Sequence, residues 1–250
     1  MEIPYRSLRL KISIIIPAFN EERLIGETLV RVKSAMDAFS RRGWATELIV
    51  CDNNSTDCTG ELAQAAGATV VFEPVNQIAR ARNCGAAAAS GEWLVFVDAD
   101  SHPSAELFGE VADQIETGTS LAGGCTVKVE GHYPVANLVT GLWNLLSRWV
   151  NWMAGSFIFC QAEAFRKVGG FSNELFVTEE IDLSKRLKRL ARENRKKIVI
   201  LHRYPLITSG RKMHLYTARE HIMFLARTVL RGGKTFNSRE ACHTWYDGRR

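Results

Sequence analysis

Short apolar runs alternate with longer segments of helical spacing along the first hundred residues. Runs typical of buried strands occupy 11–20, 46–52, 69–72 and 93–97. Between these runs, apolar residues recur every three or four positions and predict helices that end near Arg42, Gly67 and Ala89. This alternation of strand and helix predicts an α/β fold with a parallel sheet and right-handed crossovers.

The ends of the predicted helices carry their own signals. Asn20, in the segment 17-PAFNEE-22, is expected to cap the first helix, and Glu21 and Glu22 suit the positive end of its dipole. Gly67 is expected to end the second helix as the residue after its cap, since glycine adopts the left-handed conformation without strain.

The second half of the chain is less regular. Its apolar pattern predicts strands at 122–129, 156–160 and 198–201. It predicts helices over 135–153, within 176–194 and over 216–230. The sequence contains no run of 18 uncharged apolar residues, so we expect no transmembrane helix.

The segment 135–153 has an apolar stripe that allows two interpretations. It carries Trp143, Trp149 and Trp152, and Arg148 is its only charged residue. Tryptophan with a sparse positive charge suits a membrane interface. A helix that buries its stripe against the sheet and walls the acceptor side of a site is the commoner arrangement, and we expect that arrangement here.

Composition adds only broad limits. The 250 residues are 46% hydrophobic and 24% charged, which is ordinary for a soluble globular protein with a full core. The net charge of +5 fits an anionic small molecule, a membrane surface or a nucleic acid, so it discriminates little. Six cysteines without a C-x-x-C pair favour a reduced compartment, and the first residues lack the apolar core of a signal peptide. We therefore expect a cytoplasmic protein.

Carboxylates follow the predicted strands where those strands end. Asp52 ends the second strand, and Asp98 and Asp100 follow the apolar run in 93-WLVFVDADSHP-103. Ligands of parallel α/β sheets bind outside the carboxyl ends of the strands, which is where these side chains and the loop 17–22 should meet. Two carboxylates at i and i+2 on one face suit Mg²⁺ or Mn²⁺, with phosphate oxygens and water completing the coordination shell.

An alternative is that Asp98 and Asp100 are turn residues that cap a helix starting near Ser104. The sequence has neither a G-x-G-x-x-G motif after its first strand nor a G-x-x-x-x-G-K-[ST] motif anywhere. Phosphates would then have to be neutralised by a metal and by basic residues. Arg80 and Arg82, in 79-ARARN-83, could supply that charge, although a solvated helix face would explain them too.

Taken together, these motifs resemble a family 2 glycosyltransferase of the GT-A fold. The resemblance rests on PAFNEE, CDNNSTD, ARNCGA and WLVFVDAD in this order, followed by 169-GGF-171, 179-EEIDLSKRL-187 and 208-TSGRK-212. It implies a mixed, mostly parallel sheet flanked by helices. We expect a GT-A domain over 1–212 and a helical C-terminal extension over 213–250 packed on it.

The resemblance also implies a donor site. Pro17, Ala18 and Glu21 would line the nucleotide pocket, and Asp52 would bond the polar edge of the base. Arg82 and Asp98 would lie near the nucleotide, with Asp98 and Asp100 as ligands of Mg²⁺ or Mn²⁺ and Asp100 as the main one. The expected partner is a UDP- or GDP-sugar and not a nucleic acid. The acceptor is open: a lipid-linked phosphate, a saccharide or a small metabolite.

The late acidic motif of the family usually reads Glu-Asp, with the Asp as general base, and here it reads Glu179-Glu180. The base position therefore falls on Glu180, and Asp182 is the competitor. An incoming hydroxyl needs such a carboxylate to take its proton. When a single base activates the hydroxyl and the hydroxyl attacks in line, the anomeric configuration is inverted. Favourable placement in the first turn of a helix would also explain these acids.

The altered acidic motif keeps an alternative function open: a catalytically weak sugar-nucleotide-binding module or partner subunit. A nucleotidyltransferase would want a glycine-rich loop after the first strand, and 17-PAFNEE-22 has no glycine.

Several further residues have weaker claims. Gly155-Ser156 and 169-GGF-171 are expected to shape the acceptor side, or to be turns. Arg211 and Lys212 could close over the diphosphate, and His102 and His214 are candidate extra metal ligands. The predicted helices 135–153 and 216–230 leave room for peripheral contact with the inner face of a membrane.

Overall fold

The computed structural model describes residues 10–131 and 133–210, without the side chain of residue 135. The strands are β1 Lys11–Ala18, β2 Ala45–Asp52, β3 Thr69–Phe72, β4 Trp93–Val97, β5 Ser101–His102, β6 Ser120–Val129, β7 Phe157–Gln161 and β8 Lys197–Thr208. The helices are α1 Ile25–Ser40, α2 Thr59–Ala65, α3 Ile78–Ala88, α4 Ala105–Glu116, α5 Pro134–Val150, α6 Ala162–Lys167 and α7 Glu179–Glu193. Arg211, Lys212, His214 and the predicted extension 213–250 lie outside the described residues.

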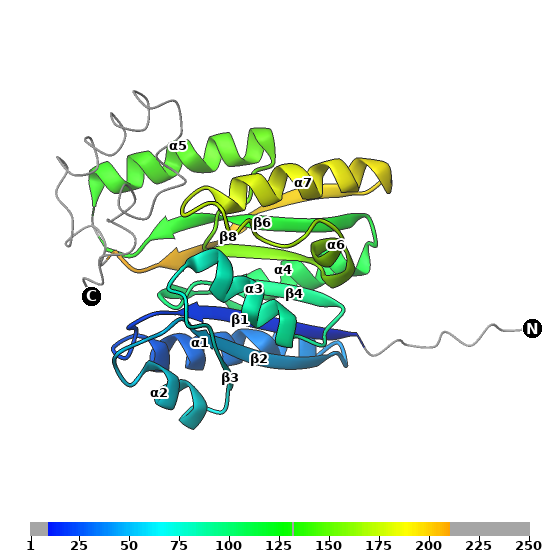
Figure 1. Ribbon diagram of the computed structural model, residues 1–250. Coiled ribbons are helices and arrows are strands. Elements are labelled where there is room, and N and C mark those ends of the chain that lie inside the picture. The colour runs from blue at the N-terminus through cyan, green and yellow to red at the C-terminus, as the bar shows by residue number, and fades with distance from the viewer. Residues whose placement is uncertain (1–9, 132, 211–250) are drawn as a thin grey trace, which may run out of the picture.

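One sheet of eight strands runs in the order β3-β2-β1-β4-β7-β6-β8-β5 (Figure 1). Strands β3, β2, β1 and β4 are parallel neighbours, as the strand–helix rhythm of the first hundred residues predicts. Strand β7 runs antiparallel between β4 and β6, whereas β8 is parallel to β6 and antiparallel to β5. The expected mixed, mostly parallel sheet is confirmed.

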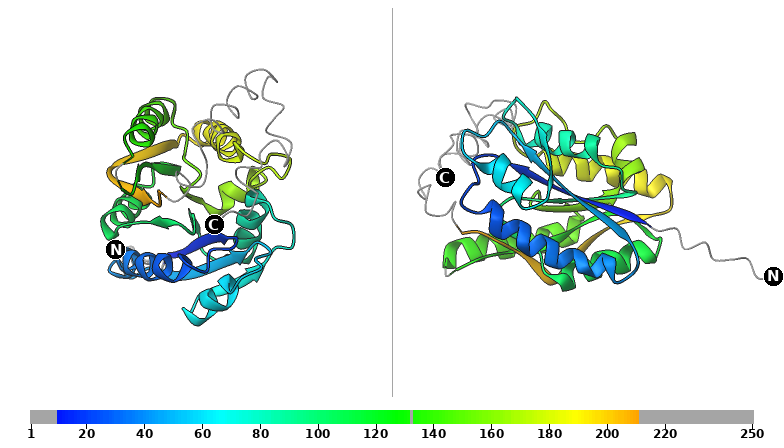
Figure 2. Two further views of the ribbon diagram at one scale, coloured as in Figure 1. Left: turned by 90° about the vertical axis from the view of Figure 1, so that its left-hand side faces the viewer. Right: turned by 90° about the horizontal axis from the view of Figure 1, so that it is seen from below.

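Helices cover both faces of this sheet (Figure 2). Successive side chains of a strand point to opposite faces, so the apolar run of β1 feeds two separate cores. Ile14 belongs to the core that contains Leu29 of α1 and Phe108 of α4. Ile15 belongs to the core that contains Ala86 of α3 and Leu187 of α7. A strand buried on both faces explains why its sequence shows no polar alternation.

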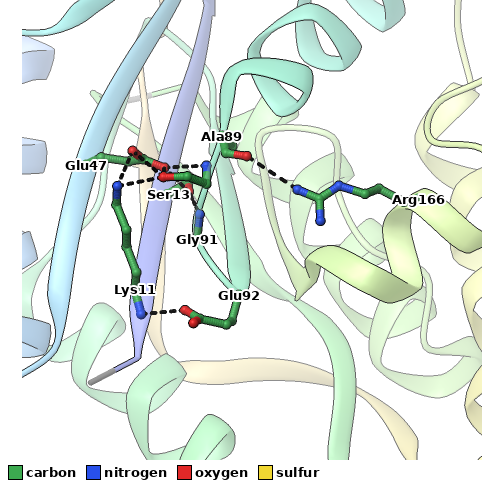
Figure 3. A network of polar contacts seen from close by, with 8 residues as sticks. Lys11, Ser13, Glu47, Ala89, Gly91, Glu92 and Arg166 are labelled. Carbon is green, nitrogen blue, oxygen red and sulfur yellow. Dashed lines mark hydrogen bonds and ion pairs between the residues drawn. The ribbon is translucent and has the colours of Figure 1, made fainter. Parts of the chain in front are cut away.

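A polar network joins the amino-terminal ends of the central strands (Figure 3). Glu47 of β2 accepts a hydrogen bond from Ser13 of β1 at 2.6 Å, and its other oxygen lies 2.6 Å from the Lys11 ammonium. Burial works to raise the pKa of Glu47, but hydrogen bonds from Lys11, Ser13 and Ser90 lower it to about 2. Gly91 N–H donates to Ser13 at 2.9 Å, which ties the start of β4 into the same network. This end of the sheet is thereby fixed, and the opposite end is left for ligands.

The prediction that Asn20 caps the first helix is wrong. Helix α1 begins at Ile25, five residues later, and Asn20 adopts a left-handed conformation with φ of 53°. The Asn20 side chain accepts the Thr56 N–H at 2.8 Å, and its own N–H donates to the Ser55 hydroxyl at 3.0 Å. Its bonding capacity therefore joins two loops instead of ending a helix.

The expectation that helix α5 buries its apolar stripe is also wrong. Leu138, Leu142 and Leu145 are exposed, and 84% of Trp149 is accessible to solvent. The helix faces the sheet with polar side chains instead: Ser147 is buried, and Asn144 hydrogen-bonds the backbone of β6. Periodicity reveals a stripe but not the direction in which the helix turns it.

Other boundaries differ in smaller ways. Strand β8 spans 12 residues, far beyond the predicted 198–201, because it pairs with β6 from Lys197 to Thr208 and also with β5 at its last two residues. The short elements β5 and α6 carry no periodic signal and were not predicted. Gly67 does follow the second helix, with φ of 77°, which confirms its predicted place.

Candidate functional site

A pocket lies at the carboxyl ends of β1 and β4, where successive crossovers change direction along the sheet. Strands β2 and β3 follow on one side of β1, and β4 lies on its other side. Such a switch point is the usual ligand crevice of an α/β sheet. The cavity measures about 380 Å³, and its charged lining residues are Glu21, Arg82, Asp98, Asp100, Glu179 and Glu180.

Arg82 of α3 is the buried cation of this pocket, with 3% of its side chain exposed. Its guanidinium donates to Glu179 at 2.6 Å, to Asp98 at 2.9 Å and to the carbonyl of Gly155 at 2.7 Å. The Phe171 ring lies 5.2 Å from the guanidinium carbon, which closes one side by a cation–π contact. One arginine therefore brings together residues that lie far apart in the sequence.

The two neighbouring glutamates of α7 have different environments. Glu179 is buried and ion-paired with Arg82, whereas Glu180 is half-buried and lines the pocket. Burial, followed by repulsion from Glu179, raises the pKa of Glu180 to about 8, against a smaller opposing effect of Arg82. A carboxyl group of this kind can take up a proton near neutral pH, as a general base must.

Asp98 and Asp100 occupy the turn directly after β4, and both line the pocket. The turn is held by the Asp98 N–H, which donates to Ser156 at 3.2 Å, and by the Ser101 N–H, which donates to the Asp98 carbonyl at 3.1 Å. The interpretation of these aspartates as helix caps is wrong, because Ser104 itself caps α4 by accepting the Leu107 N–H.

The donor residues expected from the resemblance divide into two groups. Pro17, Ala18 and Glu21 line the pocket together with Arg82 and Asp98. Asp52 is absent from the lining, and its carboxylate accepts the Ser55 N–H at 2.9 Å within the loop after β2. The structure therefore brings together all of these residues except Asp52, which holds a loop at the rim.

Asp182 is separated from the pocket. It lies on the first turns of α7 and forms an ion pair with Arg186 at 2.6 Å, and it does not belong to the lining. Of the two candidate bases, only Glu180 faces the cavity.

Asn53 and the loop before α7 belong to the site but were not predicted. The Asn53 amide donates to the carbonyls of Glu73 and Val75 at 3.1 and 2.7 Å, and its oxygen accepts the Gln77 N–H at 2.9 Å. It thereby fixes the segment that leads into α3. Phe176, Val177 and Thr178 line the pocket from the other side. Thr178 has φ of 65°, a left-handed conformation that no residue pattern before α7 predicts.

The remaining candidates lie at different distances from the cavity. Gly155 and Ser156 line it, whereas Phe171 lies behind Arg82. Arg80 is absent from the lining. His102 is buried on β5, also outside the lining, and its Nε2 atom has no hydrogen-bond partner within residues 10–131 and 133–210.

The candidate metal ligands of the pocket are Asp98 and Asp100. Within residues 10–131 and 133–210, no group of three or more His, Cys, Asp or Glu side chains is arranged to hold a metal ion. Asp98 and Asp100 offer hard oxygen ligands, which fit Mg²⁺ or Mn²⁺ only if a bound diphosphate and water supply the other ligands.

Comparison with known proteins supplies the family. Residues 13–172, more than half of the chain, match the sequence profile described as "Glycosyl transferase family 2". The chain belongs to this family.

Relatives of this chain share part of its length. An uncharacterized glycosyltransferase of Mycobacterium tuberculosis is 33% identical over 141 residues, which cover 55% of this chain and 60% of that protein. The dolichol-phosphate mannosyltransferase of Pyrococcus furiosus is 30% identical over 123 residues, which cover 46% of this chain and 33% of that one. The chain thus spans less than two thirds of the length of these relatives.

Several solved structures resemble this chain in fold. TarS 1–349 of S. aureus gives a TM-score of 0.63 at 21% identity, over 81% of this chain and 61% of that one. The mannosyltransferase PcManGT of Pyrobaculum calidifontis, in complex with GDP-Man and Mn²⁺, gives 0.66 at 19% identity, over 89% and 62%. The glucosyl-3-phosphoglycerate synthase of Mycobacterium tuberculosis, with Mn²⁺, UDP and phosphoglyceric acid, gives 0.58 at 22% identity, over 88% and 76%. These likenesses confirm the expected GT-A fold.

Proposed function

We propose that this glycosyltransferase transfers a sugar from a UDP- or GDP-sugar to an acceptor hydroxyl with inversion, and that Glu180 is the general base. The observation that carries the proposal is the position of Glu180: it faces the pocket, with a raised pKa, beside the cluster of Arg82, Asp98 and Glu179. Solved structures of similar fold contain UDP-GlcNAc, or GDP-Man with Mn²⁺, which supports a nucleotide-sugar donor.

The reaction follows from the arrangement of charges. The acceptor hydroxyl attacks the anomeric carbon, its proton passes to the Glu180 carboxylate, and the bond to the nucleotide diphosphate breaks on the opposite side of the sugar. The Arg82 guanidinium forms an ion pair with Glu179 and fixes its position, and the raised pKa of Glu180 makes Glu180 the carboxylate that accepts the proton. Attack from the side of a single base inverts the configuration.

A divalent cation is part of the proposal. Asp98 and Asp100, which both line the pocket, would hold Mg²⁺ or Mn²⁺, with Asp100 as the main ligand by its resemblance to the family motif. When bound, the cation would act as a Lewis acid that stabilises the charge of the leaving diphosphate.

Donor hydrolysis with Mn²⁺ tests the base, with UDP-GlcNAc and GDP-mannose as probes. We expect Glu180→Gln to lower kcat by about 100-fold or more while donor binding persists. In the wild type, kcat/KM should rise with pH and level off above about 8, because only the deprotonated Glu180 accepts a proton.

Asp182→Asn is the matched control, since it neutralises a carboxylate of the same helix that pairs with Arg186 outside the pocket. It should retain turnover and the pH profile. If Asp182→Asn loses turnover and Glu180→Gln keeps it, Asp182 is the base.

Peripheral contact with a membrane belongs to the same proposal. The exposed apolar face of α5, a helix that leads into the Gly155 side of the pocket, supports it. Among the residues that the structure describes, no helix has the length and hydrophobicity needed to cross a bilayer.

A further inference from the structure

Helix α5 turns its polar side inward and its apolar side outward. The Asn144 amide accepts the Val127 N–H at 3.0 Å and donates to the Val127 carbonyl at 2.9 Å, while the buried Ser147 donates to the Trp152 carbonyl. The exposed apolar side chains of the helix are Leu138, Val139, Leu142, Leu145, Leu146 and Trp149. A contiguous apolar face of this kind on a protein surface indicates a site of contact with a membrane or with another protein.

A positively charged groove between α5 and the strands β6 and β8 lies along one side of this face. The groove measures about 520 Å³, and among the described residues its lining includes Lys128, Arg148 and His202 but no acidic residue. Asn137 and Asn144 add neutral hydrogen-bonding groups. Its chemistry suits a phosphate or another small anionic group.

Helix α7 supplies positive charge on the other flank. Between Leu183 and Arg192 it carries five basic residues, of which Arg186 is ion-paired with Asp182. The Lys188 ammonium donates to the Val150 carbonyl at 2.9 Å, so this basic segment lies directly against the end of α5 (Figure 1). An apolar strip with cations on both sides is complementary to a layer of anionic headgroups above acyl chains.

We propose that the outer face of α5 docks on the surface of an anionic lipid bilayer. Leu138, Leu142, Leu145 and Trp149 enter the boundary between headgroups and acyl chains, and Lys128 and Arg148 meet lipid phosphates in the groove. Tryptophan is favoured at this depth because its ring is largely apolar and its N–H can remain hydrated. This docking is the membrane contact of the proposed function, and it depends on no step of sugar transfer.

A second copy of the chain fits this surface less well. A two-fold interface would bring the same patch of each copy together, and the cationic flanks would then face one another without acidic partners. An anionic bilayer satisfies both the apolar strip and its flanks. Docking would also bring the pocket close to the lipid surface, because only 151–154 separate α5 from Gly155, which bonds Arg82.

Vesicle flotation with the full chain tests the proposal. We expect the chain to float with vesicles of equal parts phosphatidylcholine and phosphatidylglycerol, and to bind pure phosphatidylcholine more weakly. The double variant Leu145→Ser/Trp149→Ser should weaken binding to the anionic vesicles by about tenfold or more, since it removes two inserted apolar side chains. Lys128→Glu/Arg148→Glu should abolish the preference for anionic lipid.

The matched control is Val30→Ser/Phe72→Ser, which removes two exposed apolar side chains from α1 and β3. It should bind vesicles as the wild type does. The proposal is overturned if the wild type does not bind anionic vesicles, or if Leu145→Ser/Trp149→Ser binds them as well as the control Val30→Ser/Phe72→Ser does. A dimer in light scattering that dissociates in Leu145→Ser/Trp149→Ser, without vesicle binding, would assign the face to a second copy. Donor hydrolysis without lipid, measured separately, reports on the transfer reaction alone.

Discussion

Arg82 places a full positive charge inside the wall of the pocket, and three oxygen acceptors surround its guanidinium. A buried charge is tolerated only with partners of this kind, because desolvation works against it. Glu179 and Asp98 supply two of the three contacts. The attraction of Arg82 for Glu180 is too weak to offset burial and the repulsion from Glu179, so the pKa of Glu180 rises. The different environments of the two adjacent glutamates thus follow from one arginine.

Replacing Arg82 should therefore destabilise the whole chain. We expect Arg82→Met to lower the free energy of unfolding by about 3–5 kcal/mol, because it leaves Glu179 buried without its partner. Urea denaturation measures the change. Arg80→Met is the control on the same helix, since Arg80 forms no ion pair within the described residues, and it should change the free energy little. Equal losses in the two variants would contradict this account of the site.

Residue types indicated several residues of the pocket lining but not what each side chain bonds. Asp98, Asp100 and Arg82 line the pocket, although a turn or a solvated helix face would have explained the same residue types. Asp52 also follows a strand, and Asn20 is a polar residue of the loop after β1, but the side chains of both bond the segment 53–57. Nothing in the sequence distinguishes an aspartate that holds a loop from one that lines a cavity, since both follow a strand.

At the scale of elements, the pocket depends on how closely α3 approaches the central strands. A Cβ atom on Gly85 would lie 2.5 Å from a methyl carbon of Ile15 and 3.8 Å from Cys51. Only a glycine lets the helix lie this near to β1 and β2. Arg82 stands one turn before Gly85, so the approach of the helix also sets the reach of its guanidinium into the pocket.

Gly85→Ala should consequently destabilise the chain by about 1–3 kcal/mol through overpacking. The side chain of Arg82 should shift with the helix, so donor binding should weaken in parallel. Gly109→Ala is the matched control, because a Cβ atom at this position of α4 meets nothing within 4 Å. It should leave stability unchanged or raise it by about 1 kcal/mol, since alanine favours a helix more than glycine does. Thermal unfolding of both variants checks the difference, and equal effects would contradict the close-approach argument.

Periodicity predicted the elements of the first half closely and failed on α5. The strand at 69–72 was predicted from a continuous apolar run, and the helix before β4 from apolar residues spaced three or four apart. Both patterns arise because these elements pack against the cores. The stripe of α5 has the same spacing, but Asn144 and Ser147 turn the opposite side of that helix towards β6. The direction of an amphipathic helix depends on what surrounds the molecule, and a sequence pattern alone does not contain that information.

At the scale of the whole molecule, the pocket joins two halves of one sheet. The parallel half from β3 to β4 provides Ala18 and Asp98, whereas the half built on β7, β6 and β8 carries α7 with Glu180. In the part of the chain that the structure describes, β4 and β7 form the one strand pair that joins the two halves. A ligand that contacts both halves should therefore stabilise the folded chain more than a ligand that contacts only one of them.

The final prediction follows from this junction. At about 100 times its dissociation constant, a ligand of the folded state adds about 2.7 kcal/mol to stability, or about 5–10 °C in Tm for a chain of this size. We expect UDP-GlcNAc or GDP-mannose to produce such a shift with Mn²⁺ and a much smaller one without it. Asp100→Asn should lose the Mn²⁺-dependent part because it removes a charged oxygen ligand while keeping the shape of the side chain.

Asp37→Ala serves as the control, because it removes an exposed carboxylate from α1 far from the pocket lining. It should keep the full Mn²⁺-dependent shift in differential scanning fluorimetry. A shift that survives in Asp100→Asn would remove the metal from the proposal and leave the Arg82 side of the pocket to bind the diphosphate. Because Asp100 and Arg82 approach the cavity from β4 and α3, the two outcomes would assign the phosphate groups to different sides of the same junction.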